Sequence, residues 1–302
     1  MNIADKIIYV QHAQIDKVKW NLCIHNSTFP ILYGLSWYLD CVSPGWDALV
    51  MGDYRAVMPL PVLKKFGISV LAHPFYSQQL GVFSAEVADI SYFLKHIPHK
   101  FAFGRLQLNE SNQFTAGATR RIDCHLSLNA NYEQLRKGYN ENTRRNINKS
   151  LKNNLLQAQF SVDELIRFKT QNSKITIKPQ QLELFRNLLK TLIERGYGYI
   201  QGLKLETGEP AAMVFWLHSQ GRYIYLSANS SPEGTETRAM FRLLDDFIRL
   251  HAGEKDSIID FEGSGIESVR KFYTGFGAHC VYFPEIQFYH HFGHFLKLFR
   301  LC

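Results

Sequence analysis

Closely spaced cysteines are missing from this 302-residue sequence. The five cysteines lie far apart, no two form a Cys-x-x-Cys pair, and their number is odd. This pattern argues against a disulfide framework and against a zinc site. Reduced thiols in a cytosolic protein are the simplest interpretation.

Long apolar segments are missing as well. No window of the sequence reaches the ~20 apolar residues that a membrane-spanning helix requires. The first residues, MNIADKIIYVQHAQIDK, contain no small-residue cleavage site of the kind that follows a signal peptide. We therefore expect a cytoplasmic protein without a transmembrane segment.

Acidic residues are outnumbered by basic ones. The chain has 34 Lys and Arg against 27 Asp and Glu, which gives a formal net charge of +7 and a pI of about 9.1. A basic balance favours anionic partners such as nucleotide phosphates, RNA or an acidic membrane surface. A basic protein that binds no anion has the same composition, so the charge alone does not choose a partner.

Helix-like and strand-like segments alternate along both halves of the chain. In the second half, two amphipathic helices precede three strand-like segments, and a helix, a strand, a helix and a final strand follow. This order indicates an α+β (α/β layered) fold. We expect three parts, namely a lobe over residues 1–131, a basic helical connector over 132–157 and a second lobe over 158–302.

The connector differs in character from both lobes, since it is rich in Asn, Lys and Arg. Four of its cations, at spacings of three and four residues, would lie on neighbouring helix faces: Arg144, Arg145, Lys149 and Lys152. Such a helix can bind an anion such as tRNA, or it can be a solvated connector. Both interpretations stay open.

One segment combines acids, glycines and a tyrosine: DFEGSGIESVRKFYTGFGA, residues 260–278. In an extended strand, Asp260 and Glu262 would share one face, at a strand end where ligands often bind. Glu262 could then accept a proton from an attacking amine, and Tyr273 could protonate a leaving group. In the alternative interpretation, Tyr273 belongs to the apolar face of a helix and packs in the core.

The segment SPEGTETRA, residues 231–239, opens a predicted helix. Helix amino termini favour anions, Gly234 would allow a ligand to approach the backbone, and Arg238 would add positive charge. We therefore predict that Gly234, Thr235, Arg238 and Ala239 bind a phosphate-bearing cofactor. Ordinary helix capping by Ser231 explains the same pattern without any ligand.

In the first lobe, HPFYSQQLG gathers uncharged polar groups, among them His73, Tyr76, Gln78 and Gln79. Tyr76, Gln78 and Gln79 are candidates for binding a peptide or sugar-like acceptor. A turn that satisfies its own backbone hydrogen bonds would show the same residues.

The order of elements resembles the GNAT superfamily of N-acyltransferases, and the whole chain resembles its two-lobed FemABX-like branch. The second lobe carries this resemblance in AAMVFW, YIYLSANSSPEGTETRAMFRLLDDFI and DFEGSGIESVRKFYTGFGA. MPLPVLKKFG and PFYSQQLGVFS carry it in the first lobe, and ENTRRNINKSLKNN in the connector. The segment Tyr273–Ala278 resembles the Tyr and Gly-Phe that commonly lie beside the acyl-CoA thioester in GNAT proteins.

The resemblance implies tandem GNAT-like domains, each with a mixed, mostly antiparallel sheet flanked by helices. It implies transfer of an acyl group from acetyl-CoA or another acyl-CoA to an amine-bearing small molecule or peptide, with Tyr273 and Glu262 in catalysis. The usual pyrophosphate loop, Arg/Gln-x-x-Gly-x-Gly/Ala, corresponds to residues 234–239, where only Ala239 fits. Many FemABX-like proteins use aminoacyl-tRNA instead, so this donor is the alternative.

The carboxyl-terminal segment FYHHFGHFLKLFRLC raises two further possibilities. His290, His291 and His294 lack a nearby acid or cysteine at ligand spacing, so we expect no metal. Its mixture of aromatic, leucine and basic residues could touch a membrane surface, although packing on the last strand explains it as well. A non-catalytic protein of this fold that binds RNA or a membrane is the third functional hypothesis.

Overall fold

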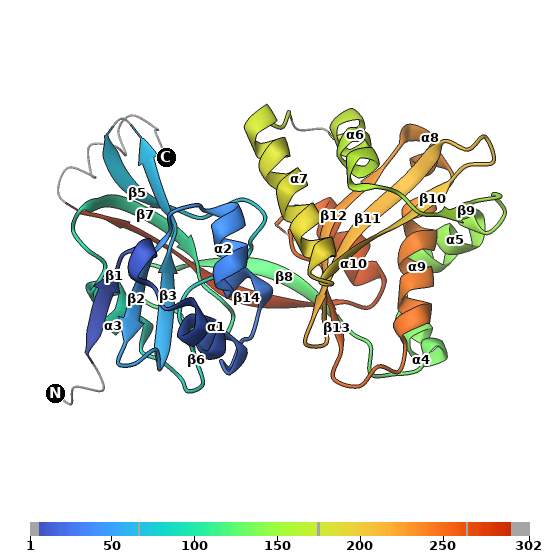
Figure 1. Ribbon diagram of the computed structural model, residues 1–302. Coiled ribbons are helices and arrows are strands. Elements are labelled where there is room, and N and C mark those ends of the chain that lie inside the picture. Colours follow the sequence, from blue (N-terminus) through green and yellow to red (C-terminus); the bar gives the residue numbers. More distant parts are fainter. Residues whose placement is uncertain (1–5, 66, 174–175, 264, 291–302) are drawn as a thin grey trace. The chain divides into compact units, whose positions relative to one another are not determined.

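The computed structural model describes residues 6–65, 67–173, 176–263 and 265–290 (Figure 1). Its contacts divide the chain into two compact units, which are treated separately below. The first unit comprises the described residues up to Arg121 and from Tyr282 onward. The second unit runs from Ile122 to Val281.

The first unit contains three helices and two short 3₁₀ turns among its described residues. The helices are α1 (Lys17–His25), α2 (Ser36–Val42) and α3 (Ile90–Lys95), and the turns are His12–Gln14 and Leu32–Gly34. Its strands are β1 (Ile7–Val10), β2 (Asp47–Met51), β3 (Ala56–Leu60), β4 (Val62–Lys65), β5 (Ile68–Ala72), β6 (Phe83–Ser84) and β7 (Phe101–Gln107).

Strand pairing in the first unit is mostly antiparallel. The strands β1, β2, β3 and β6 pair in that order, and every pair is antiparallel. The strands β4 and β5 are also antiparallel, whereas β5 and β7 run parallel. Residues 285–289 of β14 (His279–Tyr289) pair antiparallel with β7. Apolar side chains from these strands and from α3 form one buried cluster.

The second unit begins within β8 (Thr119–Ser127) and ends within β14. Its helices are α4 (Tyr132–Lys137), α5 (Glu141–Ser150), α6 (Val162–Asn172), α7 (Pro179–Glu194), α8 (Pro232–Glu236), α9 (Ala239–His251) and α10 (Glu267–Gly275). Its further strands are β9 (Leu156–Ala158), β10 (Gly198–Lys204), β11 (Pro210–Ser219), β12 (Arg222–Ser230) and β13 (Ile258–Asp260).

The second unit is built on a mixed sheet in the order β8-β13-β12-β11-β10-β9. The β12/β13 pair is parallel, and the β8/β13, β11/β12, β10/β11 and β9/β10 pairs are antiparallel. Both units therefore combine helices with mixed, mostly antiparallel sheets, and the predicted α+β class is confirmed.

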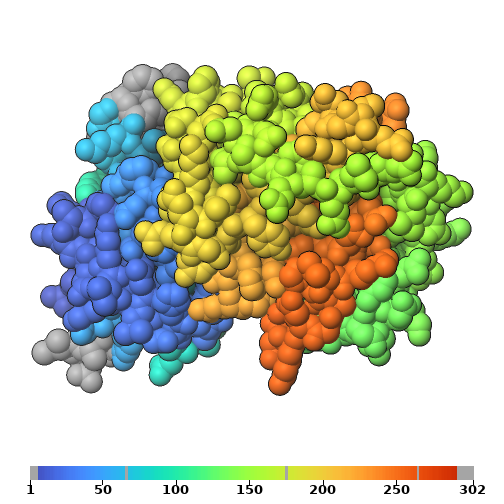
Figure 2. All heavy atoms as spheres, turned by 45° about the vertical axis from the view of Figure 1, so that its right-hand side comes forward, coloured from blue at the N-terminus to red at the C-terminus, as the bar shows by residue number. Residues whose placement is uncertain are grey.

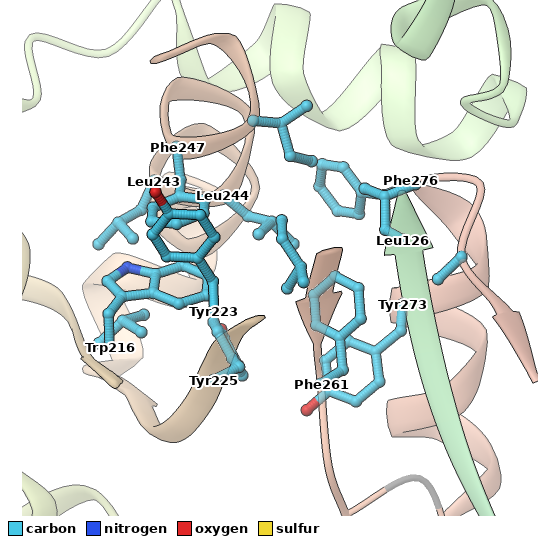
Figure 3. Packing of buried hydrophobic residues seen from close by; sticks show 14 of the residues in the cluster. Leu126, Trp216, Tyr223, Tyr225, Leu243, Leu244, Phe247, Phe261, Tyr273 and Phe276 are labelled. Atoms are coloured by element: carbon cyan, nitrogen blue, oxygen red, sulfur yellow. The ribbon is translucent and has the colours of Figure 1, made fainter. Parts of the chain in front are cut away.

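Helices cover both faces of this sheet. Consecutive residues of β11 point to opposite faces. Phe215 packs beside Leu192 of α7, whereas Trp216 stacks on Phe247 of α9 with ring centroids 3.7 Å apart. The outer side of α7, in yellow in Figure 2, lies at the surface. The α9 face holds an aromatic cluster that also includes Phe261 and Tyr273 (Figure 3).

The observed units differ from the expected division at residues 131/132 and 157/158. The connector is an integral part of the second unit, because Tyr139 and Ile147 are buried in its core and the N–H of Asn140 donates to the Gly275 carbonyl. The end of β14 belongs to the first unit because it pairs with β7. The exposed cations on the outer face of α5 explain why the sequence indicated a connector here.

Candidate functional site

Two parallel strands of the second unit diverge at their carboxyl ends. The β12/β13 ladder extends from the Arg222–Ile258 pair to the Ile224–Asp260 pair. Beyond this point β13 has ended, whereas β12 continues to Ser230. A bulge in the β11/β12 ladder lies at the same level, and bulges bend the strand that carries them. Such diverging carboxyl ends are a favoured position for ligands.

A pocket of about 350 Å³ lies beside the end of β12. Its walls come from β12, from α8 and α9, and from α10: Tyr225, Ala228, Asn229, Ser230, Gly234, Thr235, Arg238, Met240, Phe241, Ser268, Val269, Phe272 and Tyr273. Three of the predicted cofactor residues thus share a pocket with the predicted catalytic tyrosine. The fourth, Ala239, is fully buried in the core and does not line the pocket.

Tyr273 is held between aromatic rings at the base of this pocket. Its ring stacks on Phe261 at 4.4 Å and meets the edge of Tyr225 at 5.8 Å (Figure 3). Burial raises the pKa of the Tyr273 phenol, and the nearby charge of Glu262 raises it further. The phenol therefore stays protonated and can donate a proton. Tyr273 is a buried core residue that also lines the pocket, and its role as a catalytic acid stays a prediction.

Glu262 lies just past the end of β13. Its φ is 49°, in the left-handed region, and its N–H donates to Asp260 Oδ1 over 3.1 Å. The expectation that Asp260 and Glu262 face one cleft was wrong, because side-chain alternation requires an extended backbone and the strand ends at Asp260. Asp260 is 1% exposed, whereas Glu262 is half-buried and does not line the pocket.

Arg238 separates α8 from α9. Its φ of 61° is unusual for a residue with a side chain, and such conformations cluster at functional sites. Its Nη1 donates to the Thr235 carbonyl over 3.0 Å. Its Nε is buried, and no described residue accepts a hydrogen bond from it. The pocket therefore contains a cationic group with an unused donor.

Gly234 serves packing rather than ligand approach. A Cβ atom at this position would lie 1.8 Å from the Ala211 carbonyl oxygen, so α8 can rest on β11 only with glycine here. The N–H of Gly234 donates to the Ser231 hydroxyl, which caps α8. The sequence-based role of Gly234 in admitting a ligand is replaced by this contact, although the residue lines the pocket.

A buried polar cluster, which the sequence did not predict, extends across β8, β13 and β12. Arg222 Nη1 lies 2.6 Å from Asp260 Oδ2, and His125 Nε2 lies 3.7 Å from the same oxygen and 3.5 Å from Asp123 Oδ2. Burial and the charge of Asp260 raise the pKa of Asp123 well above its usual range. Arg222 and His125 hold the pKa of Asp260 below its usual range, against the effect of burial.

The guanidinium of Arg222 already supplies positive charge to this cluster. Asp123, His125 and Asp260 present ligand atoms within 4.8 Å of one another, a spacing that could hold a cation. The guanidinium of Arg222 already lies 2.6 Å from Asp260 and 3.3 Å from His125 Nε2. These residues therefore fit a proton-sharing carboxyl pair neutralised by arginine better than a metal centre. The alternation of polar residues in IDCHLSLN was the available sequence signal.

The residues of the first unit that were predicted to bind the acceptor make hydrogen bonds within their own unit. Gln79 is fully buried, and its Oε1 accepts the Glu110 N–H over 2.9 Å while its Nε2 donates to Gln78. Gln79 is therefore a structural residue, not a substrate ligand. Tyr76 has a φ of 63°, and its carbonyl accepts a hydrogen bond from Tyr38. Tyr76 and Gln78 are half-buried, and their role stays a prediction.

Residues 140–267 match the family model described as an acetyltransferase (GNAT) domain. In structural comparison the chain is similar to FemX, with a TM-score of 0.62, 11% identity, and coverage of 92% of this chain and 96% of that one. The chain has a FemABX-like GNAT fold. The predicted resemblance is thereby confirmed at the level of the fold.

Two other solved structures share this FemABX-like GNAT fold. A conserved protein of unknown function from Bacteroides thetaiotaomicron VPI-5482 has a TM-score of 0.57, 12% identity, and coverage of 94% of this chain and 98% of that one. L-PGS from Bacillus licheniformis has a TM-score of 0.53, 12% identity, and coverage of 94% and 95%. No curated protein matches the chain by sequence.

The match to the GNAT domain covers most of the pocket. It includes β12, α8 and α9, and it ends at the first residue of α10, before Tyr273. It also includes α5, whose outer face carries a shallow depression of about 440 Å³. The four cations predicted to be neighbours line this depression with Glu141 and Asn148: Arg144, Arg145, Lys149 and Lys152.

A larger pocket of about 820 Å³ lies on the other side of the α8 start, between α6 and the β10–β11 turn. Three carboxylates line it, those of Glu164, Glu209 and Glu233, together with the guanidinium of Arg167. Its charge is therefore opposite to that of the α5 depression.

The carboxyl-terminal tail lies outside the described residues from position 291 onward, so His291, His294 and the membrane-contact hypothesis stay predictions. His290 is described, and its Nδ1 lies 3.1 Å from the Phe101 carbonyl oxygen. Within the described part of the chain, no helix is both long and apolar enough to cross a membrane.

Proposed function

We propose that this protein is an N-acyltransferase. It would move an acyl or aminoacyl group from an activated donor, bound in the pocket beside β12, to an amine. The observation that carries this proposal is the meeting of Tyr273, Thr235 and Arg238 in one pocket at the divergence of β12 and β13. The GNAT domain match over residues 140–267 supports the same reaction class.

The proposed chemistry is direct transfer. The amine nitrogen attacks the donor carbonyl carbon, and the oxyanion that forms needs hydrogen-bond donors. Backbone N–H groups of β12 beyond Ile224, where the ladder with β13 has ended, are suited to this task. As the bond to the leaving group breaks, Tyr273 donates its phenolic proton to that group. The attacking amine loses its proton to a base, for which Glu262 remains the candidate.

An acyl-CoA is the first candidate donor. Met240, Phe241, Val269 and Phe272 give the pocket apolar walls that suit a flexible, weakly polar arm. The unused Nε–H of Arg238 would be satisfied by a phosphate oxygen. The volume of about 350 Å³ falls within the usual range for ligand pockets.

An aminoacyl-tRNA is the second candidate donor, favoured by the state of Tyr273. Its pKa is raised above that of an ordinary phenol. Such a group gives its proton more readily to an alkoxide, the leaving group of an aminoacyl ester, than to a thiolate, whose pKa is about 8.5. The cationic outer face of α5 would attract the tRNA backbone.

The acceptor is proposed to be an amine-bearing small molecule or peptide. An ammonium group fits the larger pocket, because Glu164, Glu209 and Glu233 give that pocket negative charge. The acceptor-binding role of the half-buried Tyr76 and Gln78, in the first unit, is a separate prediction.

Calorimetric titration with acetyl-CoA and with free CoA, at low and moderate salt, tests the donor. The Val269→Trp variant should lose this binding because the indole fills the pocket, while Lys271→Trp is the matched control. Lys271 lies on the same helix, has a side chain 74% exposed and does not line the pocket. Gly234 is unsuitable for this test because any side chain there displaces α8.

Binding that survives in Lys271→Trp and disappears in Val269→Trp would support an acyl-CoA donor. If neither CoA compound binds, aminoacyl-tRNA is titrated next, and its affinity should fall steeply with salt. Transfer of a labelled aminoacyl group to an added amine would support the second donor. Salt-dependent tRNA binding without any transfer would favour a non-catalytic protein and contradict the proposed function.

A further inference from the structure

Two cysteines of the second unit lie side by side on neighbouring strands. Cys124 is on β8 and Cys280 is on β14, and these strands are adjacent in the sheet. Their Sγ atoms are 3.7 Å apart, although the residues are 156 positions apart in the sequence. Both are in the reduced state. The sequence spacing gave no sign of this proximity, because it arises only when the chain returns from the second unit.

The geometry is compatible with a bond between these sulfurs. Neighbouring strands place facing Cα atoms about 4.5–5.5 Å apart, which is within the range of disulfides. Both side chains contact the same apolar cluster, so they are on one face of the sheet. The sulfurs would need to approach by about 1.7 Å to reach the disulfide distance, a shift that side-chain rotation can supply.

The two cysteines differ in access to solvent. Cys124 is fully buried, whereas Cys280 is half-buried at the edge of the same cluster. A small oxidant can therefore reach Cys280 first, and Cys124 then lies beside it as the second thiol. This arrangement of an accessible thiol with an adjacent partner is the one that reversible thiol oxidation requires.

We propose that Cys124 and Cys280 form an oxidative modification site that accepts a low-molecular-weight disulfide such as oxidised glutathione. The Cys280 thiolate attacks one sulfur of the small disulfide, forms a mixed disulfide and releases one small thiol. The Cys124 thiolate then attacks Cys280 Sγ and releases the second small thiol. The protein loses two thiol protons and two electrons, and the small disulfide is reduced to two thiols.

The bond would form next to the candidate catalytic tyrosine. The Cys124 carbonyl accepts the N–H of Phe261, whose ring stacks on Tyr273. The bond would also close a loop that contains almost the entire second unit, and closure of a long loop restricts the unfolded chain. Oxidation should therefore raise the melting temperature of the second unit, and a reductant should reverse the change.

The experiment uses the full chain carrying Cys302→Ser, because Cys302 lies outside the described residues. The reduced protein is incubated with oxidised glutathione and alkylated, and it is then digested and mapped by mass spectrometry without reduction. The expected result is a peptide pair joined through Cys124 and Cys280, with two fewer alkylated thiols and a higher melting temperature. The reductant dithiothreitol should restore both.

Single variants test the order of the steps. Cys124→Ser should trap glutathione on Cys280, and Cys280→Ser should leave Cys124 unmodified in the folded protein. Cys41→Ser is the matched control, because Cys41 is also partly exposed but belongs to the first unit, and it should leave the cross-link unchanged. The proposal is overturned if Cys280 carries glutathione while Cys124 stays a free thiol, if both stay reduced, or if either pairs with another cysteine.

Discussion

Two polar segments that looked alike in the sequence behave differently in the structure. In the first unit, the loop around Gln79 uses its polar groups within the unit, since Gln79 is fully buried and both Gln79 and His73 hydrogen-bond to residues of that unit. In the second unit, the segment around Arg238 keeps a buried donor unused beside a pocket. A row of polar residues indicates a site only where the backbone leaves space around them.

The space beside Arg238 arises because strand pairing in the sheet ends at this level. The parallel β12/β13 ladder ends at Asp260, and the continuing β12 forms one wall of the pocket. In the first unit, β5 and β7 are also parallel, but the loop after β5 stays bonded to β7 through the N–H of His73 and the N–H of Leu80. The predictions below test whether the first segment is structural and the second functional.

Removing the phenolic hydroxyl with Tyr273→Phe should have the largest effect. The ring keeps its stacking on Phe261, so the fold should persist while the proton donor is lost. Loss of a positioned acid typically lowers the rate by roughly 10²–10⁴-fold. The measurement is kcat with whichever donor binds, and it should fall with little change in KM.

Tyr223→Phe is the matched control for this change. Tyr223 is buried in the same aromatic cluster, and its hydroxyl donates to Glu254 rather than lining the pocket. Its variant should keep full turnover. Equal turnover in Tyr273→Phe and wild type would remove the acid role and leave Tyr273 as a packing residue like those of the first-unit loop.

The buried carboxyl pair should show strong non-additivity. In Asp260→Asn, Asp123 can ionise and pair with Arg222 instead, so each single variant should be tolerated. The double variant Asp123→Asn/Asp260→Asn removes both carboxyl groups of the cluster, including the one that is paired with the mostly buried Arg222. It should lose about 3–5 kcal/mol in the free energy of unfolding. Urea denaturation of the three variants checks this, and simple additivity of two small losses would contradict it.

Acidification should destabilise the first unit through His73. Burial lowers the pKa of His73 to about 4, from about 6.5 in the unfolded chain. Its Nδ1 accepts the Gln107 N–H over 3.2 Å, so protonation would break that bond. The stabilisation is complete above pH 6.5 and is lost as the pH falls toward 4.

This loss should amount to about 2–3 kcal/mol between pH 7.5 and 4.5. Glutamine does not titrate, so the free energy of unfolding of His73→Gln should fall by about 2–3 kcal/mol less than that of the wild type between pH 7.5 and 4.5. If urea denaturation shows the same pH dependence for both proteins, then protonation of His73 costs the folded state no free energy. His73 would then be able to hydrogen-bond a ligand.

Gln79→Ala should affect stability, not substrate binding. It removes the fully buried side chain that accepts the Glu110 N–H, and loss of such a partner typically costs about 1–3 kcal/mol. Gln113→Ala, at an exposed position of the same unit, is the control and should cost about 0.5 kcal/mol or less. If Gln79→Ala is as stable as the control but weakens acceptor binding, then Gln79 is a ligand-binding residue after all.

The sequence predicted the parts of this protein that depend on local pattern. The amphipathic α7, the meander of β10 to β12 and the capped start of α8 follow from periodicity, turn residues and Ser231-Pro232. The pocket depends on the point where β12 and β13 stop pairing. These strands are distant in the sequence, so only the resemblance to a known family could indicate the pocket. The same limit explains why the packing role of Gly234 was not predicted, since its contact with Ala211 joins segments from different elements.

The smallest expected effect is that of Asp123→Asn near pH 5. A protonated Asp123 and an asparagine have nearly the same shape, and the amide can still donate to Asp260. The change in the free energy of unfolding should be about 1 kcal/mol or less. The pH dependence of this change in free energy is more informative. The raised pKa of Asp123 keeps its carboxyl group protonated in the folded protein, whereas the unfolded chain releases this proton above pH ~3.9.

Wild-type stability from this group is therefore complete below pH ~3.9 and declines as the pH rises toward the folded pKa. Asparagine does not titrate, so Asp123→Asn should become more stable relative to wild type between pH 5 and pH 8, as followed by urea denaturation. A variant that instead becomes relatively less stable as the pH rises would show that Asp123 is ionised in the folded protein. Arg222 would then face two charged carboxylates, and the cluster would have the excess negative charge that a bound cation requires.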